Sequence, residues 1–299
     1  MMRHLILLCL FLCIGCSIEK ANADDKVEIK PTKLIDNLYM LEGQGGNILI
    51  CISETEGVLM IDDQFAPLTD QIIETVSEIT DQPVRYVINT HWHGDHTGGN
   101  ENMGKRGAVI VAHENVRKRM TEEQFNTFFK RKTAPAPKEA LPTITFTEDM
   151  TFFWGEEEIQ LHHVENAHTD GDAFVWFPQS NVLHTGDVYF EIGYPYIDLS
   201  SGGSAQGIIA ACKEMLSAIN DETKVIPGHG AISSKEMLTD YVYMMETVLG
   251  KMEEAIKEGK TADEIHEANL SKEFDEKYGK GFIKPGDFSI FLYNSLVKG

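Results

Sequence analysis

Residues 90–99, with the sequence THWHGDHTGG, hold three histidines and one aspartate within six positions. Imidazole nitrogen and carboxylate oxygen suit a borderline cation such as zinc. Histidines that only satisfy hydrogen bonds are the alternative, but the pattern H-x-H-x-D-H should arise by chance in roughly one chain in a thousand of this composition. His91 and His93 can share one metal ion, whereas Asp95 and His96 lie further around the bend and can reach a second. The spacing therefore favours two metal ions over one.

Two metal ions need more ligands than this segment offers. Further candidates follow the strands expected at residues 159–164, 182–185 and 224–226, and they are His168, Asp187 and His229. The last of these stands in the sequence PGHG, where the glycines let the backbone approach the site closely.

These side chains can meet only if strands bring their ends together, and the hydrophobic pattern predicts such strands in two successive halves. In the first half, strands are expected at residues 47–53, 58–62, 84–89 and 108–112, with helices at 68–79 and from 114 onward. In the second half, strands are expected at 144–146, 150–154, 159–164, 173–177, 182–185 and 224–226, with helices at 206–219 and 235–257. Residues 131–142, rich in proline and alanine, are expected to form the loop between the halves. The repetition favours an α/β fold in which two sheets pack face to face with helices outside.

A further helix is expected after residue 260, because Thr261 and Glu264 form a capping-box pattern. We therefore expect a main domain at residues 24–250 and a helical extension at residues 251–299 that packs on it.

The motifs, in this order and at this spacing, resemble the metallo-β-lactamase superfamily over about residues 33–241. The resemblance implies a four-layer αβ/βα sandwich of two mixed β-sheets, and two bound zinc ions. It gives the first zinc ion the ligands His91, His93 and His168. It gives the second zinc ion the ligands Asp95, His96 and His229. Asp187 then bridges the two ions or completes the second site.

Two more residues are candidates for orienting the ligands. Asp62 falls where the family places a carboxylate that orients a ligand histidine. His184, three residues before Asp187, has either such a role or a place in the core.

The chemistry expected of this site is hydrolysis. Water held between two zinc ions has its pKa lowered from about 16 towards 7, which gives a hydroxide nucleophile at neutral pH. Asp95 is the candidate catalytic residue, because it can orient that hydroxide and take its proton. Iron or manganese is a minor alternative to zinc.

The bond that is cleaved is left open among amide, ester, lactone and thioester. The chain most resembles class B β-lactamases and their exported relatives, but Asp187 stands where some of those enzymes have a zinc-binding cysteine. Phe190 stands where many have a lysine for the β-lactam carboxylate. Aspartate at that position is typical of glyoxalase II-like thioesterases and lactonases. A β-lactamase proper, such a thioesterase and a non-catalytic metal-binding protein are therefore alternatives.

An aromatic segment follows Asp187 directly and is a candidate wall for a substrate pocket, with ordinary loop packing as the alternative. Its members are Tyr189, Phe190, Tyr194 and Tyr196. A formal net charge of −21 disfavours a nucleic-acid partner, since a phosphate backbone requires a basic surface. The expected partner is a small-molecule substrate.

The amino terminus has the pattern of an export signal, in which Arg3 and His4 precede an apolar run at residues 5–14. Cleavage is expected after Ala23, which would place the protein in the periplasm or outside the cell. A lipoprotein anchored at Cys16 is the alternative. The mature chain then keeps Cys51 and Cys212, which are expected to be two buried thiols.

Overall fold

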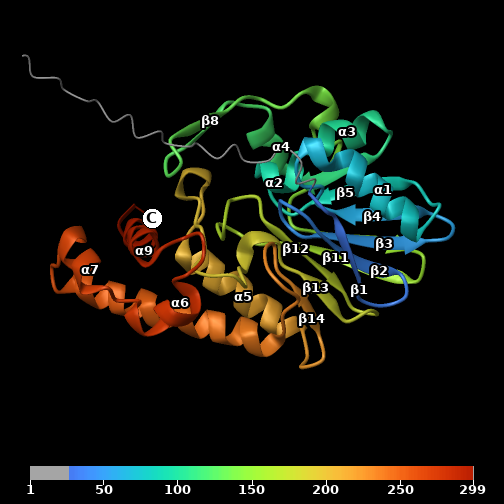
Figure 1. The fold of residues 1–299 in the computed structure, drawn as a ribbon. Helices are drawn as coiled ribbons and strands as arrows, with labels where there is room; N and C mark the ends of the chain where they lie inside the picture. The colour runs from blue at the N-terminus through green and yellow to red at the C-terminus, as the bar shows by residue number, and fades with distance from the viewer. Residues whose placement is uncertain (1–26, 299) are drawn as a thin grey trace, which may run out of the picture.

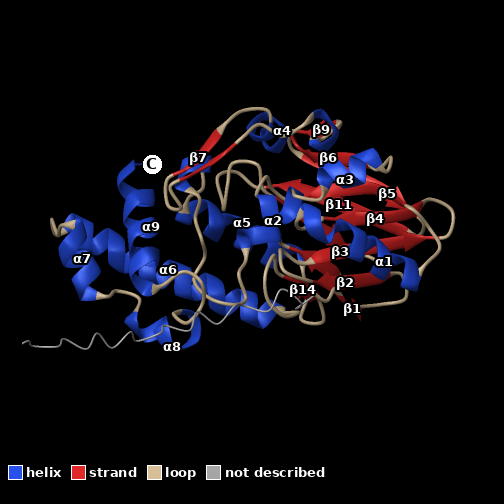
Figure 2. Ribbon diagram, turned by 45° about the horizontal axis from the view of Figure 1, so that its top comes forward, coloured by secondary structure: helices blue, strands red, loops and turns tan. Residues whose placement is uncertain are grey.

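The computed structural model describes residues 27–298. The expected signal segment at residues 1–23, with its alternative anchor Cys16, lies outside the described residues. Two β-sheets pack face to face, and helices cover both outer faces (Figures 1 and 2). The αβ/βα sandwich predicted from the sequence is confirmed.

The first sheet has seven strands. In spatial order they are β1 (Lys30–Lys33), β2 (Leu38–Glu42), β3 (Ile48–Ser53), β4 (Gly57–Ile61), β5 (Val84–Asn89), β6 (Val109–His113) and β9 (Ile144–Phe146). Strands β1 to β4 pair antiparallel, and β4, β5, β6 and β9 pair parallel. The helices of this half are α1 (Thr69–Ile79), α2 (Gly94–Thr97), α3 (Asn100–Lys105) and α4 (Glu114–Met120).

The second sheet has five strands, β10 (Asp149–Trp154), β11 (Glu157–His163), β12 (Ala173–Phe177), β13 (Val182–His184) and β14 (Lys224–Ile226). Only the last pair, β13 with β14, is parallel. The helices of this half are α5 (Ala205–Ala218), α6 (Lys235–Lys257), α7 (Ala262–Ala268), α8 (Asp275–Tyr278) and α9 (Pro285–Lys298).

Alternate side chains of β3 show why the layers stack as they do. Leu49 and Cys51 pack into the core between the sheets, whereas Ile48 and Ile50 pack beneath α1 with Ile72. All five are at least 99% buried. Because successive residues of a strand point to opposite faces, a strand that is apolar at every position must be covered on both sides. The continuous apolar run in the sequence thus requires a second sheet on one face and helices on the other.

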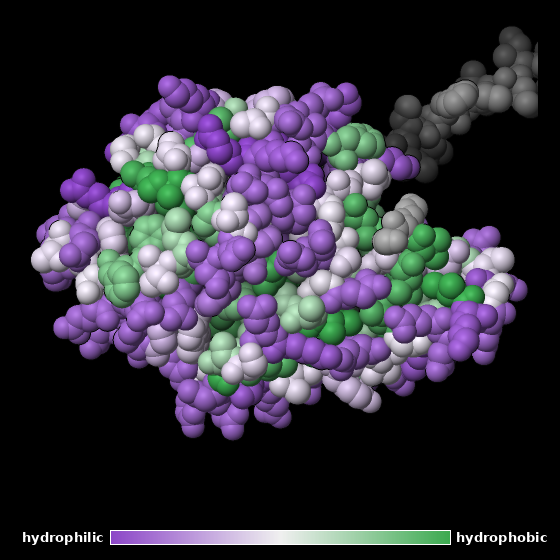
Figure 3. Space-filling view, turned by 180° about the vertical axis from the view of Figure 1, so that it is seen from behind, coloured by the Kyte–Doolittle hydropathy of each residue, from purple (hydrophilic) through white to green (hydrophobic). Residues whose placement is uncertain are grey.

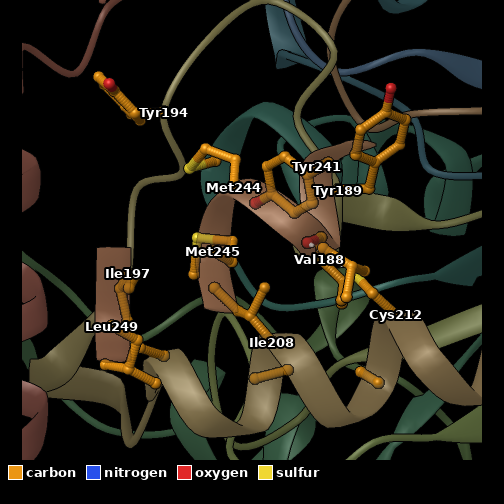
Figure 4. Packing of buried hydrophobic residues seen from close by; sticks show 14 of the residues in the cluster. Val188, Tyr189, Tyr194, Ile197, Ile208, Cys212, Tyr241, Met244, Met245 and Leu249 are labelled. Carbon is orange, nitrogen blue, oxygen red and sulfur yellow. Dashed lines mark hydrogen bonds between the residues drawn. The ribbon is translucent and has the colours of Figure 1, made fainter. Parts of the chain in front are cut away.

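A further core lies between the second sheet and the helices α5, α6 and α9 (Figure 4). In it Ile208 and Cys212 of α5 are buried in one cluster with Met245 and Leu249 of α6. Cys212 and Cys51 are both free and buried, which confirms the prediction of two buried thiols.

The expected loop at residues 131–142 is wrong in part. Residues 131–133 form strand β8 (Arg131–Thr133), which pairs with β7 (Gln124–Asn126) in a separate hairpin. These strands are short and exposed, so they carry no alternating apolar pattern from which they could have been predicted.

The boundary expected at residue 250 falls inside α6, which runs unbroken from Lys235 to Lys257. Helix α9 packs against both α5 and α6, and Phe288 and Leu292 of α9 are fully buried in the core that α5 and α6 share. The carboxyl-terminal helices therefore share that core.

Hydrophilic side chains cover most of the face seen in Figure 3, with smaller apolar patches between them. Among the described helices, none has the length and apolar character needed to cross a membrane.

Candidate metal centre

Loops that follow strands β5, β11, β13 and β14 converge on one site. The residues that they carry are, in chain order, His91, His93, His168, Asp187 and His229. The one-turn helix α2 adds Asp95 and His96. The structure thus brings together all seven ligand candidates of the sequence, in two groups that share Asp187.

The first group consists of His91, His93, His168 and Asp187, whose ligand atoms lie within 4.8 Å of one another. His93 Nδ1 lies 2.9 Å from His168 Nε2. Asp187 Oδ2 lies 3.7 Å from His168 Nε2 and 3.8 Å from His91 Nε2. Burial lowers the pKa of His91 and His168, so both imidazoles are neutral, which is the form that binds a metal ion.

The second group consists of Asp95, His96, Asp187 and His229, also within 4.8 Å. His229 Nε2 lies 3.1 Å from Asp95 Oδ2, and His96 Nε2 lies 3.1 Å from Asp187 Oδ1. Burial works against ionisation of Asp95, but the neighbouring His96 and His229 outweigh it and lower the pKa of Asp95 to about 2. This group therefore presents ionised carboxylates, as a cation site requires.

The chemistry of these donors fits a pair of metal ions. His91 Nε2 is buried and has no hydrogen-bond partner among the described residues. A buried nitrogen left without a partner costs free energy unless something binds it. Each group also offers imidazole nitrogens together with carboxylate oxygen, the donor set that zinc takes in proteins.

Asp62, at the end of β4, orients ligands of both groups. Its Oδ2 accepts hydrogen bonds from His96 Nδ1 at 2.7 Å and from the Thr90 hydroxyl at 2.8 Å, and its Oδ1 accepts from the Thr90 backbone N–H. Thr90 Oγ1 lies 3.1 Å from His91 Nδ1. The φ of Asp62 is 60°, a left-handed conformation that is strained for a residue with a side chain. These hydrogen bonds hold that conformation in place.

Asp198 has a similar position beside His93, and the sequence analysis missed it. Its Oδ2 accepts a hydrogen bond from His93 Nε2 at 3.0 Å, which leaves His93 Nδ1 facing the first group. The hydroxyls of Ser200 and Ser201 also donate to this carboxylate. No spacing or strand-end signal distinguishes Asp198 in the sequence, because it lies in an irregular segment 105 residues from His93.

His184 is fully buried and supports the loop that carries Asp187. Its Nε2 donates to the Asn47 carbonyl at 3.1 Å, and its Nδ1 accepts from the Gly186 N–H at 3.2 Å. Asn47 also donates to the carbonyls of Pro227 and Gly230, on either side of His229. The pair therefore fixes the backbone of two ligand loops, and the hydrogen bonds of both side chains go to backbone groups.

Two glycines allow the backbone to approach the ligands. A Cβ at Gly228 would stand 2.0 Å from Asp187 Oδ1, and a Cβ at Gly46 would stand 2.2 Å from the His96 ring. Neither position can carry a side chain without displacing a ligand.

A cavity of about 690 Å³ opens over the two groups. Phe190 lines it and stacks on His229, with ring centroids 5.8 Å apart. Tyr196 also lines it, with its ring centroid 6.0 Å from that of His93. These two aromatic residues stand where the sequence analysis expected a pocket wall.

Of the other two expected wall residues, Tyr189 lies outside the cavity and Tyr194 only borders it. Tyr189 does not line the cavity: its ring packs on Tyr241 in the core (Figure 4). Its hydroxyl is hydrogen-bonded to Ser233. Tyr194 borders the cavity, but it is 98% buried and its ring stacks on Phe288 at 4.3 Å. Along this segment, the rings of Tyr189 and Tyr194 pack in the core, whereas those of Phe190 and Tyr196 face the cavity.

The hairpin of β7 and β8 forms another wall of the cavity, to which Asn126, Phe129 and Arg131 contribute. Asn126 Nδ2 donates to the Tyr196 hydroxyl and, at 3.4 Å, to Asp198. The hairpin is thus joined by hydrogen bonds to the residue that orients His93.

A family model described as the metallo-beta-lactamase superfamily matches residues 32–229. Among curated proteins, the chain is 23% identical to a metallo-beta-lactamase type 2 of Bacteroides fragilis, over 71% of this chain and 83% of that protein. It is 24% identical to a metallo-beta-lactamase type 2 of Bacillus sp. (strain 170), over 63% of this chain and 68% of that protein. It is 26% identical to a hydroxyacylglutathione hydrolase of Polaromonas sp., over 64% of this chain and 65% of that protein.

Two solved structures show how widely this fold is shared. A metallo-beta-lactamase from Pontibacter korlensis has a TM-score of 0.58 at 20% identity, covering 73% of this chain and 99% of its own. A stereoselective inverting sec-alkylsulfatase from Pseudomonas sp. has a TM-score of 0.70 at 18% identity, covering 90% of this chain and 50% of its own.

Proposed function

The chain belongs to the metallo-beta-lactamase superfamily, and on that premise we propose that it is a dinuclear zinc hydrolase. The observation that carries the proposal is the pair of ligand groups that share the Asp187 carboxylate. Two zinc ions supply Lewis acidity and lower the pKa of water towards neutrality.

In this proposal each residue of the centre has a definite task. His91, His93 and His168 hold one ion, Asp95, His96 and His229 hold the other, and Asp187 serves both. Asp95 lines the cavity and keeps its side chain 30% exposed. Its ionised carboxylate is therefore the group that can orient the attacking water and accept a proton from it.

The cavity favours ester, lactone and thioester substrates over β-lactams. Phe190 places an apolar ring against His229, at the position where the family resemblance leads one to expect a cation for the β-lactam carboxylate. Of the two arginines that line the cavity, Arg119 is paired with Asp170 and Arg131 stands on the exposed hairpin. Among these substrates, the similarity to a hydroxyacylglutathione hydrolase supports a thioester.

The test is metal analysis of the protein purified from residue 24 onward, with nitrocefin, lactones and thioesters assayed on the same sample. About two zinc ions with chelator-sensitive ester or thioester turnover would support the proposal. Two ions without any turnover would favour a metal-binding protein instead, and strong nitrocefin turnover would favour a β-lactamase. Iron or manganese in place of zinc would refute the metal assignment.

His93→Ala tests the residues themselves. We expect this variant to lose metal and activity together, because His93 is a ligand of the first group. His162→Ala is the matched control, since His162 lies on β11 and pairs with Asp149 outside the cavity. A metal-replete and active His93→Ala protein would disprove the site.

Asp187→Cys tests whether this position selects the substrate. Sulfur is a softer ligand than carboxylate and less suited to reaching both ions, so the ratio of lactam to ester turnover should change. An unchanged ratio would mean that substrate choice is determined elsewhere.

A further inference from the structure

The carboxyl-terminal region forms part of the cavity wall. Phe282 and Ile283, just before α9, line the cavity. Ile283 is bridged to Tyr194 by backbone pairing, and a Cβ at Gly193 would stand 3.1 Å from Gly281. The segment at residues 281–283 is thus packed against the loop that follows Asp187.

The hairpin of β7 and β8 meets this segment from the other side. The rings of Phe129 and Phe282 stack with centroids 5.9 Å apart, and Phe128 packs edge-on against Phe291 of α9 at 5.0 Å. Figures 1 and 2 both show the hairpin reaching from the first half of the chain towards α9. The two segments, roughly 150 residues apart in sequence, together form an arch beside the metal centre.

The arch carries large apolar side chains that remain exposed. Phe129 is 47% exposed, Phe282 is 67% exposed, and Ile192 beside them in the cavity wall is 51% exposed. We call these three residues the portal. Single exposed apolar residues are common, but several gathered around one cavity mark a binding surface.

The cavity is also far larger than a small polar substrate needs. Its volume of about 690 Å³ lies in the range of pockets that enclose drug-sized ligands. Met120, Ala136 and Pro137 extend its apolar lining beyond the metal ligands.

We propose that the portal binds an apolar acyl or aryl group, so that the substrates are esters, thioesters or lactones that carry a hydrocarbon chain or aromatic ring next to the bond that is cleaved. This substrate class rests on the hydrolase function proposed above. The residues that select it come from the hairpin and the carboxyl-terminal segment, and they are distinct from those that hold the metal ions.

The size of the effect follows from the transfer of apolar surface. Each methylene group that is fully buried increases binding about fourfold, and each methylene group that packs against a half-exposed wall increases it roughly twofold. Between an acetyl and an octanoyl ester the wild-type kcat/KM should therefore rise at least tenfold.

The test compares p-nitrophenyl esters of two to eight carbons on wild-type protein, Phe129→Ala and Phe282→Ala. In both variants the loss of kcat/KM should grow with chain length, from about twofold for acetyl to tenfold or more for octanoyl. Phe153→Ala is the matched control, because Phe153 is 78% exposed on β10 and does not line the cavity. This control should keep the wild-type chain-length profile.

A flat wild-type profile, or losses that are equal at every chain length, would overturn the proposal. If no ester, lactone or thioester is cleaved, the hydrolase function fails, and the portal is then tested by fluorescence titration with anilinonaphthalene sulfonate. Saturable probe binding that weakens at least fivefold in Phe282→Ala but not in Phe153→Ala would support the apolar site. Equal binding in the two variants would refute it.

Discussion

Asp198→Asn should weaken the first metal site and leave the second intact. Asp198 is 99% buried, and its carboxylate accepts the His93 Nε2 hydrogen at 3.0 Å. Burial alone would raise the pKa of Asp198, but His93 and the hydroxyls of Ser200 and Ser201 hold it well below its usual range. The carboxylate is therefore charged at any assay pH, and the substitution removes one full charge without changing the shape of the side chain.

The expected loss of zinc affinity follows from the change in the hydrogen bond between His93 and residue 198. A hydrogen bond to a charged group contributes about 1.5–3 kcal/mol, against about 0.5–1.5 kcal/mol for a neutral one. A difference of about 1.4 kcal/mol corresponds to a tenfold weaker zinc affinity, at the low end of the effects seen for partners of metal-ligating histidines. Asp198→Ala also removes the hydrogen-bond acceptor and the volume of the side chain, and it should weaken the zinc affinity of the first site closer to a hundredfold.

The assay is competition for zinc with a chromogenic chelator, fitted to two sites. The second site is the internal reference, because the Asp198 side chain is hydrogen-bonded to His93, Asn126, Ser200 and Ser201 and not to His96 or His229. Asp149→Asn is the matched control, since Asp149 is exposed and pairs with His162 outside the centre. Unchanged affinity at both sites, or a loss confined to the second, would show that Asp198 does not orient His93.

Three further expectations can be checked with simple measurements. Arg131→Gln should lower kcat/KM for anionic substrates relative to neutral ones by less than about fivefold, because exposed ion pairs contribute only about 0.2–1 kcal/mol; a larger effect that salt does not reduce would contradict this. Burial raises the pKa of Cys51 to about 12, and it also raises the pKa of Cys212. A thiol reagent should therefore modify neither residue near pH 8 until the protein unfolds. Rapid labelling of the native protein would contradict this expectation. We also propose that the chain is exported, and intact mass should then place the mature amino terminus after Ala23, whereas a lipid mass on Cys16 would indicate an anchored protein.

Several strands of the two sheets could be predicted because apolar residues dominate them. Residues 84–89, 173–177 and 224–226 are short segments rich in apolar residues, and the observed strands have the same bounds. The ligand candidates were found by their chemistry, since few other roles place so many histidines at strand ends.

The features that the sequence did not predict depend on contacts between distant segments. The β7–β8 hairpin is fixed by Asn126 against Tyr196 and Asp198, and no local pattern reveals such contacts. Tyr189 and Phe190 are adjacent in an aromatic run, but Tyr189 points into the core and Phe190 into the cavity. Composition alone cannot separate neighbours that face opposite ways.

The ligand groups join parts of the chain that are remote from each other. His93 and His168 are 75 residues apart, and His96 and His229 are 133 residues apart. A chain with two free cysteines and no disulfide among its described residues would thus gain two inorganic cross-links on metal binding. Closing a loop of roughly 100 residues covalently is worth up to about 4.7 kcal/mol. Zinc supply would then govern the lifetime of the folded protein against proteases as well as its turnover.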